Sequence, residues 1–268
     1  VAGKFSMAGG TVTATNTTLA MSSTSASIVG GSQTLNNLTI DPSTAGTISL
    51  ATSDLTVSGT LSVAAGDTLS LASGRTLTHT GATLTLPDTA TISGSGTLVY
   101  RSTTAFPTTG NASSSLTFDA TANDQTVSAR TYGGAVKIDN SGTLSRSVTL
   151  SAGTVTFQST LDVAESGSGS VNLTGAANDP TVNLTGDLTC STGTGNTITT
   201  GAGTWTASGN VNLTNCTLTT ESGNALTFNG SSPTLTTNSQ TFNGLNFSGA
   251  TTPTISGNAT ANGNVTLA

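Results

Sequence analysis

The sequence predicts an all-β fold, a parallel β-helix (β-solenoid) with three short strands in each coil of about 21–23 residues. Three observations predict it. Residues that favour strands far outnumber those that favour helices, apolar residues alternate over short segments, and these segments recur at a nearly constant spacing.

The composition favours strands over helices. Charged residues are 7% of the 268 residues and aromatic residues 4%, so the Glu, Lys and Arg side chains that favour helices are scarce. Thr, Val and Ile recur throughout and suit pleated strands. Disordered chains combine low hydrophobicity with high net charge, whereas aliphatic residues are regularly spaced here. We therefore expect a folded chain with almost no helix.

Short alternating pairs of apolar residues mark the expected strands. In each pair the residue between the two apolar ones is Thr or Ser, which would point outward from a half-buried strand. Turns rich in Gly, Ser, Asn and Asp separate the pairs, as at Ser58-Gly59 and Gly66-Asp67. Representative pairs are Leu55/Val57, Leu61/Val63, Leu69/Leu71 and Leu84/Leu86.

The pairs recur about every 7 to 8 residues and group in threes, which predicts three strands per coil. Equivalent positions of successive coils should then stack on one another. The alignments this predicts are Leu55 with Leu77 and Leu98, Leu61 with Leu84, and Leu69 with Ile92.

A longer repeat offers an alternative fold. Residues 33–40 (QTLNNLTI) reappear as residues 240–247 (QTFNGLNF), and Gln125-Thr126-Val127 begins a third copy. This period of about 90 to 115 residues is also the size of an immunoglobulin-like domain, so tandem β-sandwiches are the alternative. Very short, evenly spaced strands and few aromatic residues favour the solenoid.

We expect residues 1–268 to form one continuous β-solenoid that is a segment of a longer repeat protein. The alternation fails at residues 101–111 and 129–134, which predicts protruding loops there.

The repeated phrases carry a resemblance to a known class of proteins. Residues 55–63 (LTVSGTLSV) and 257–267 (GNATANGNVTL) resemble the β-strand-repeat regions of large bacterial surface proteins, namely filamentous-haemagglutinin-like adhesins and autotransporter passenger domains. The resemblance covers nearly the whole chain but is one of style, without a diagnostic motif. It implies a secreted parallel β-helix, extracellular or at the cell surface, that acts as a stalk, an adhesin or a matrix fibre.

Charge and hydropathy argue against two classes of partner. The formal net charge is −6 and Lys and Arg total six, whereas binding along nucleic-acid phosphates needs clustered basic residues. No apolar run approaches the roughly 20 residues that span a bilayer. We expect neither a nucleic-acid partner nor a membrane span.

The acidic residues predict turns rather than catalysis. Asp162 and Glu165 are the one pair close in sequence, and a turn role for each is favoured over general acid and base. A β-helix enzyme that degrades polysaccharides stays as a minor alternative. The acids, most of them single and in turns, are Asp54, Asp67, Asp88, Asp119, Asp124, Asp139, Asp162, Glu165, Asp179, Asp187 and Glu221.

His79 is the single histidine, so a catalytic triad centred on histidine or a multi-histidine metal site cannot form within the chain. It shares a strand face with Leu77, which favours a structural role. Calcium-binding repeat and EF-hand motifs do not occur. We expect no enzyme activity, no cofactor and no metal site.

Cys190 and Cys216 are 26 residues apart, close to one coil, and each shares the alternation of a neighbouring Leu. Stacked positions about 5 Å apart suit a disulfide between adjacent coils. Two separate buried thiols are the other interpretation, and both stay open.

Polar residues of the expected strands suggest two further hypotheses. Outward Thr pairs, such as Thr76 with Thr78 and Thr204 with Thr206, resemble the arrays with which some solenoids bind ice, although Thr also simply suits an exposed strand. Asn-x-Ser/Thr sequons predict glycosylation sites, although stacked amide ladders are the favoured interpretation. These sequons include Asn16, Asn37, Asn111, Asn172, Asn183, Asn212, Asn229, Asn246, Asn258 and Asn264.

Together these features predict a non-catalytic extracellular fibre or stalk segment of a surface or filament-forming protein. Its expected partner is itself, head-to-tail or laterally. The main alternative is an adhesin that binds glycans or a host surface through the two expected loops, and further alternatives are an ice-binding solenoid and the polysaccharide-degrading enzyme.

Overall fold

The computed structural model describes residues 3–10, 12, 15–249 and 252–267. All strand pairs between these residues that have a defined register are parallel, and the same residues contain no helix. The fold is therefore a parallel β-solenoid, as predicted. Immunoglobulin-like sandwiches are excluded because their strands pair antiparallel. No described segment is a helix that could cross a bilayer.

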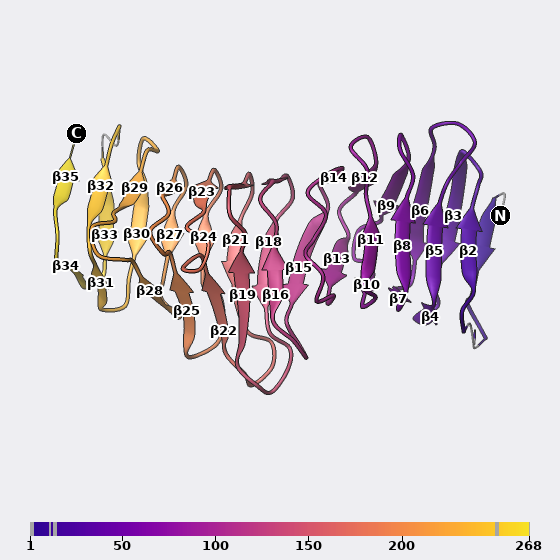
Figure 1. Ribbon diagram of the computed structural model, residues 1–268, viewed down its shortest axis with the longest axis horizontal. Helices are drawn as coiled ribbons and strands as arrows, with labels where there is room; N and C mark the ends of the chain where they lie inside the picture. Colours follow the sequence, from indigo (N-terminus) through magenta and orange to yellow (C-terminus); the bar gives the residue numbers. More distant parts are fainter. Residues whose placement is uncertain (1–2, 11, 13–14, 250–251, 268) are drawn as a thin grey trace. The chain divides into compact units, whose positions relative to one another are not determined.

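The chain divides into two compact units, Val1–Thr117 and Phe118–Ala268, and the division falls within β15 (Ser115–Asp119). In unit 1 the strands stack on three faces, which we call 1A, 1B and 1C (Figure 1). Face 1A holds β1 (Lys4–Ser6), β3 (Ser25–Val29), β6 (Thr47–Thr52), β9 (Thr68–Leu71), β12 (Thr91–Ser93) and β14 (Asn111–Ala112). Face 1B holds β2 (Thr18–Met21), β5 (Asn37–Ile40), β8 (Thr60–Val63) and β11 (Thr83–Thr85), and face 1C holds β4 (Gln33–Leu35), β7 (Leu55–Val57), β10 (Thr76–His79) and β13 (Thr97–Tyr100).

Unit 2 also has three faces, 2A, 2B and 2C. Face 2A holds β16 (Gln125–Val127), β19 (Arg146–Leu150), β22 (Val171–Thr174), β25 (Asn196–Thr199) and β28 (Cys216–Thr219), followed by a separate pair, β31 (Gln240–Phe242) and β34 (Ala259–Ala261). Face 2B holds β17 (Thr131–Tyr132), β20 (Thr154–Phe157), β23 (Thr181–Leu184), β26 (Trp205–Ala207), β29 (Leu226–Phe228), β32 (Leu245–Phe247) and β35 (Val265–Leu267). Face 2C holds β18 (Val136–Asp139), β21 (Leu161–Val163), β24 (Leu188–Thr189), β27 (Val211–Asn212), β30 (Thr234–Thr236) and β33 (Thr254–Ser256).

The register in unit 1 follows the predicted alignment of aliphatic residues. Leu77 pairs with both Leu55 and Leu98, and all three side chains are buried. On the other two faces Leu61 pairs with Leu84, and Leu69 pairs with Ile92. Inward positions thus stack in columns, because each coil can bury its apolar side chains only against its neighbours.

The coils of unit 2 are less regular than the predicted 21–23 residues. Leu161 pairs with Leu188, a step of 27 residues, whereas Leu226 pairs with Leu245, a step of 19. The strands keep their short lengths, so the differences lie in the turns between them. Turns of Gly, Ser and Asn change length without disturbing the buried columns.

Aromatic residues take places in the same columns. In unit 2 Trp205 lies between Val182 and Leu226 in the stack and is 1% exposed. On the same face the rings of Phe228 and Phe247 stack with centroids 5.0 Å apart. One column of successive coils therefore accepts both aliphatic and flat aromatic side chains.

The two segments expected to protrude are held by buried aromatic residues. Within residues 101–111 the chain lacks a strand until β14, but Phe106 is 1% exposed and meets Tyr100 edge-on at 5.2 Å. Within residues 129–134 the short strand β17 pairs with β20, and Tyr132 is buried. Residues 129–134 thus form part of a coil, because an aromatic residue replaces the usual aliphatic one at the inward position.

Close stacking in unit 1 leaves no room for a side chain at Gly81. A Cβ atom there would overlap the backbone carbonyl of Gly59, one coil away. We expect Gly81→Ala to destabilise the fold by about 2 kcal/mol, since overpacking forces backbone shifts. Gly10→Ala is the matched control, because a Cβ atom at Gly10 meets nothing within 4 Å. Equal midpoints of thermal unfolding by circular dichroism for the two variants would contradict this stacking.

Candidate functional site

Several acidic side chains of unit 2 bond to the neighbouring coil. Asp119 accepts hydrogen bonds from the backbone nitrogen and the hydroxyl of Ser141, at 2.9 and 2.8 Å. Asp139 accepts the same two bonds from Ser166, both at 2.9 Å. Each carboxylate thus joins a strand end to a turn one coil further on, and both are nearly buried.

Other acids act in the same way through a single backbone N–H group. Since the partner is 21 to 23 residues away, each bond joins two coils. The pairs are Asp54 with Thr76, Asp67 with Gly46, Asp124 with Ser147, Asp179 with Ala202, and Asp187 with Asn210.

Asp162 and Glu165, the one acidic pair close in sequence, differ in their surroundings: the Asp162 carboxylate is hydrogen-bonded, whereas the Oε2 atom of Glu165 is buried and has no hydrogen-bond partner among the described residues. Both Asp162 oxygens accept hydrogen bonds, from Ser191 at 3.0 and 2.6 Å and from Thr189 at 2.9 Å. At Glu165 it is the backbone carbonyl that accepts a bond from Thr192. No cluster of three or more His, Cys, Asp or Glu that could hold a metal ion occurs among the described residues.

His79 lies on the inward face of β10, as its alternation with Leu77 predicts, and is fully buried. Its Nε2 atom lies 3.1 Å from the carbonyl oxygen of Gly59, so Nε2 carries the proton that is donated. The ring stacks on Tyr100 with centroids 5.6 Å apart. Burial lowers the pKa of His79 below its ordinary value of 6.5, against two backbone hydrogen bonds that raise it. The neutral imidazole is thus part of the core.

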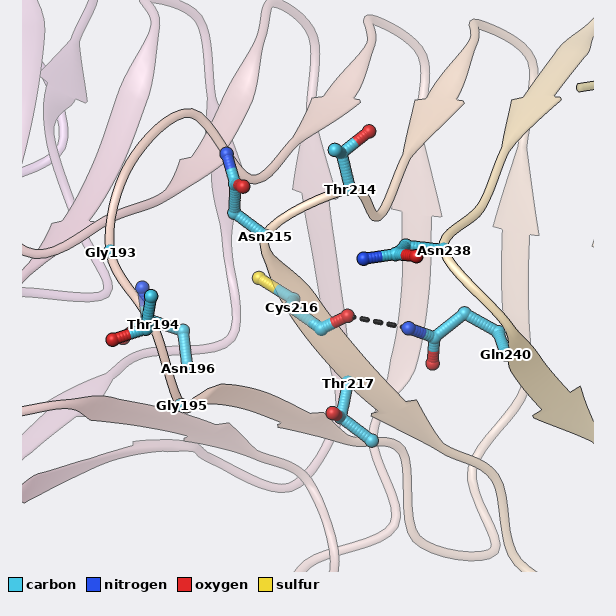
Figure 2. A pocket seen from close by; sticks show the side chains of 10 residues that line it. All are labelled: Gly193, Thr194, Gly195, Asn196, Thr214, Asn215, Cys216, Thr217, Asn238 and Gln240. Carbon is cyan, nitrogen blue, oxygen red and sulfur yellow. Dashed lines mark hydrogen bonds between the residues drawn. The ribbon is translucent and has the colours of Figure 1, made fainter. Parts of the chain in front are cut away.

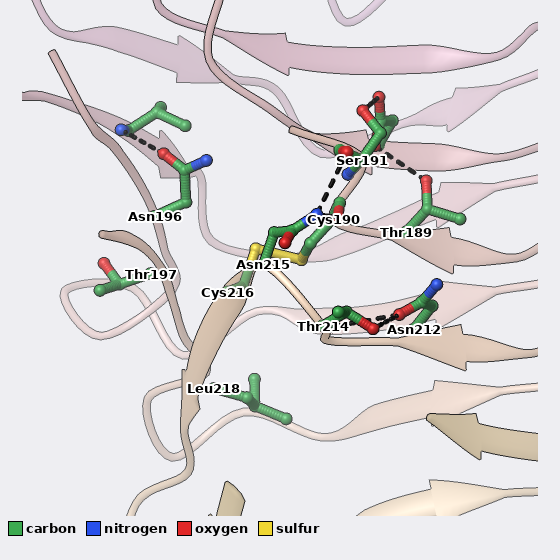
Figure 3. Close-up of a disulfide and its surroundings, with 12 residues drawn as sticks. Thr189, Cys190, Ser191, Asn196, Thr197, Asn212, Thr214, Asn215, Cys216 and Leu218 are labelled. Atoms are coloured by element: carbon green, nitrogen blue, oxygen red, sulfur yellow. Dashed lines mark hydrogen bonds between the residues drawn. A yellow bond between two sulfur atoms is a disulfide. The ribbon is translucent and has the colours of Figure 1, made fainter. Parts of the chain in front are cut away.

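Cys190 and Cys216 form a disulfide between adjacent coils of unit 2, with Cα atoms 5.8 Å apart (Figure 3). Cys190 follows β24 and Cys216 begins β28, where it lies in register with Asn196. Beside the bond, Asn215 donates from its amide nitrogen to the carbonyl oxygens of Cys190 and Ser191, at 3.0 and 3.1 Å. The disulfide and this amide together join the same two turns.

The sequon asparagines differ in their hydrogen bonds and in their exposure. Several have amides that bond to an adjacent coil: Asn37 accepts from the Thr60 nitrogen, Asn172 from the Thr197 hydroxyl and Asn229 from the Ser208 hydroxyl. Asn183 donates to Thr156, and Asn212 accepts within its own turn from Thr214. Asn246 is half-buried, and the exposed side chains are those of Asn16, Asn111, Asn212, Asn229, Asn258 and Asn264.

Threonine side chains form outward columns on the solenoid faces. On face 2A one column runs through five successive strands, namely Thr126, Thr149, Thr174, Thr199 and Thr219. On face 1C, however, Thr78 pairs with Thr56 on one side and with Val99 on the other. Such columns arise because Thr is abundant at outward positions and the register places equivalent positions of successive coils side by side.

The candidate site is a set of hollows on face 2A, where the strand ladder is interrupted between β28 and β31. Gln240 begins β31 and is 6% exposed. Its Oε1 atom accepts a hydrogen bond from the Leu218 nitrogen at 3.0 Å, and its Nε2 atom donates to the Cys216 carbonyl at 2.7 Å. A side-chain amide therefore takes the place of backbone pairing at this step.

The hollow nearest the disulfide has a volume of about 280 Å³ and crosses the corner between faces 2C and 2A. In Figure 2 the turn from Gly193 to Asn196 borders one side, Asn215 to Thr217 lie between, and Asn238 and Gln240 border the other. Three successive coils thus contribute to it.

Two further hollows of about 430 Å³ each continue from the first, one after the other. The next one shares Asn238 and Gln240 with the first and continues over the outer side of face 2A. The third shares Asn243 and Asn262 with the second and lies at the corner between faces 2A and 2B. The set forms a polar groove, which we call the amide groove.

The sequence gives only an indirect signal of the amide groove. Gln33, Gln125 and Gln240 occupy equivalent places in the long repeat, and a polar residue at an inward position of a strand is unusual. Gln33 behaves similarly, since its Oε1 atom accepts from the Val12 nitrogen at 3.0 Å. At Gln33 and Gln240 the side-chain amide bonds to the backbone of another coil.

Comparisons with protein-family models, with curated proteins and with solved structures find no match for this chain.

We expect free-thiol labelling of unreduced, denatured protein to detect neither cysteine. The double variant Cys190→Ser/Cys216→Ser should lose about 3–4 kcal/mol of stability, because the disulfide closes a loop of 26 residues. Chemical denaturation measures this loss. Reductant should lower the denaturation midpoint of the native protein and leave the midpoint of the double variant unchanged. Labelling of both thiols in unreduced protein would contradict the disulfide.

Stability should fall as the pH drops below about 6.5, where the unfolded chain protonates His79 and the folded chain does not. The unfolded state then binds more protons, so the free energy of unfolding decreases toward the lowered pKa of the folded state. His79→Phe keeps an aromatic ring against Tyr100 and removes this titration. Unfolding midpoints measured between pH 7.5 and 5 test this. Identical pH slopes for the two proteins would show that His79 does not titrate differently on folding.

Proposed function

We propose that this chain is a non-catalytic segment of an extracellular fibre or stalk, in a surface or filament-forming protein. The observation that carries the proposal is the use of the acidic side chains. In unit 2 the carboxylates of Asp119, Asp139 and Asp162 accept hydrogen bonds that join successive coils. Chemical groups that an enzyme would expose to a substrate are engaged here in the wall of the solenoid.

The outer surface supports the same proposal. The strand faces carry Thr, Ser and Asn in register, and few charged side chains interrupt them. A polar, nearly uncharged surface gives little reason for association with nucleic acid or with charged partners. Such a surface suits a spacer that keeps other parts of a protein apart.

The coil of β33, β34 and β35 offers a surface on which a further coil could stack. Its inward-facing apolar residues are exposed: Ile255 by 45%, Val265 by 53% and Leu267 by 71%. The edges of β33, β34 and β35 also offer backbone groups that can pair with an added strand. A further coil, from a second copy or from more of the same repeat, would bury the apolar side chains and extend the ladder.

Negative-stain electron microscopy of the purified 268-residue chain tests the fibre hypothesis. We expect filaments that lengthen with protein concentration. Val265→Asp/Leu267→Asp places charges on the terminal coil and should leave single particles. Leu144→Asp is the matched control, because Leu144 is 63% exposed and lies in a turn away from that coil. Single particles for the native chain, or filaments unaffected by the double variant, would refute assembly through this coil.

A further inference from the structure

The amide groove lies where backbone strand pairing is interrupted on one face of unit 2 and continues on the other two. At the step from β28 to β31 the ladder of face 2A is interrupted. At the same step β29 pairs with β32 on face 2B and β30 pairs with β33 on face 2C. The two coils are therefore held together behind a local opening in the wall.

Side-chain amides hold this opening. Gln240 fills the interrupted step with its two hydrogen bonds to the backbone of β28. At the other end of β31, Asn243 bonds to Thr220 twice, through its backbone nitrogen to the hydroxyl at 3.0 Å and through its amide nitrogen to the carbonyl. Both ends of the step are thus fixed, so the groove is a built feature of this face.

The lining of the amide groove is polar and uncharged. Its three hollows are lined mainly by Asn, Thr, Gln, Ser and Gly, and no Asp, Glu, Lys or Arg lines any of them. Asn238, Thr241 and Asn262 are exposed along it. In the hollow toward face 2B, the Oδ1 atom of Asn246 is buried and has no hydrogen-bond partner among the described residues.

We propose that the amide groove binds a neutral oligosaccharide. Amides and hydroxyls both donate and accept hydrogen bonds, which matches the many hydroxyl groups of a sugar chain. The lack of charge in the lining offers no counter-ion for a sulfated or uronic-acid polymer, and desolvating such anions there would be costly. The exposed amides of Asn238 and Asn262 offer both donors and acceptors to such a sugar chain.

The amide groove is elongated, because its three hollows follow one another from the corner beside the disulfide, across face 2A, to the corner with face 2B. The site differs from residues 101–111 and 129–134, where Phe106 and Tyr132 are buried. It adds a binding activity to the structural role and does not depend on filament formation.

Isothermal titration calorimetry with cellohexaose, maltohexaose, chitohexaose and mannohexaose tests the proposal, with hexagalacturonate as the anionic probe. We expect saturable binding of at least one neutral hexasaccharide and none of hexagalacturonate. Asn238→Ala/Asn262→Ala should weaken this binding roughly tenfold or more, because two exposed amides are lost. Asn258→Ala is the matched control, since Asn258 is exposed on the same last coil and does not line the groove.

Thr241→Trp fills the groove from an exposed position and gives a second variant should the double variant lose its fold. Circular dichroism establishes that each variant is folded, and binding should be abolished by Thr241→Trp. The proposal is overturned if no neutral hexasaccharide binds, if hexagalacturonate binds more tightly, or if Asn258→Ala weakens binding as much as the groove variants. Filaments seen by microscopy would affect neither outcome.

Discussion

The structure depends on the parallel pairing of each strand with the equivalent strand one coil away. The pairing sets a spacing of about 4.8 Å between coils, so that buried side chains such as Leu55, Leu77 and Leu98 stack directly. No coil has a core of its own, because its apolar residues are buried only by its neighbours. The turn carboxylates and the disulfide join positions that this register has already brought together.

The aliphatic columns of unit 1 could be predicted from the sequence because inward residues alternate with Thr and Ser and recur at an almost fixed step. Turn lengths in unit 2 could not, since turns of Gly, Ser and Asn carry no periodic apolar signal. The steps of 27 residues at Leu161 and 19 at Leu226 are therefore visible only in the structure. Burial restricts which residues can occupy the inward strand positions, whereas the length and composition of the turns can vary.

The candidate site could not be predicted from the sequence either, because it depends on contacts between coils. Whether Gln240 points outward, or turns inward to bond the backbone of β28, depends on which backbone groups lie within hydrogen-bond distance. The same holds for the acids: their turn positions can be read from the sequence, but the pairing of Asp139 with Ser166 requires the register. The proximity of Cys190 and Cys216 was easier to anticipate, because their separation approximates one coil.

The position of the disulfide has a mechanical consequence. Under tension along the stacking axis of unit 2, the face without backbone pairing between β28 and β31 would yield before faces with unbroken ladders. The covalent bond between Cys190 and Cys216 joins the coils immediately before that step. If the coils separate at the interruption, the disulfide would stop the separation from spreading toward the N-terminus, and the preceding coils would stay folded under tension.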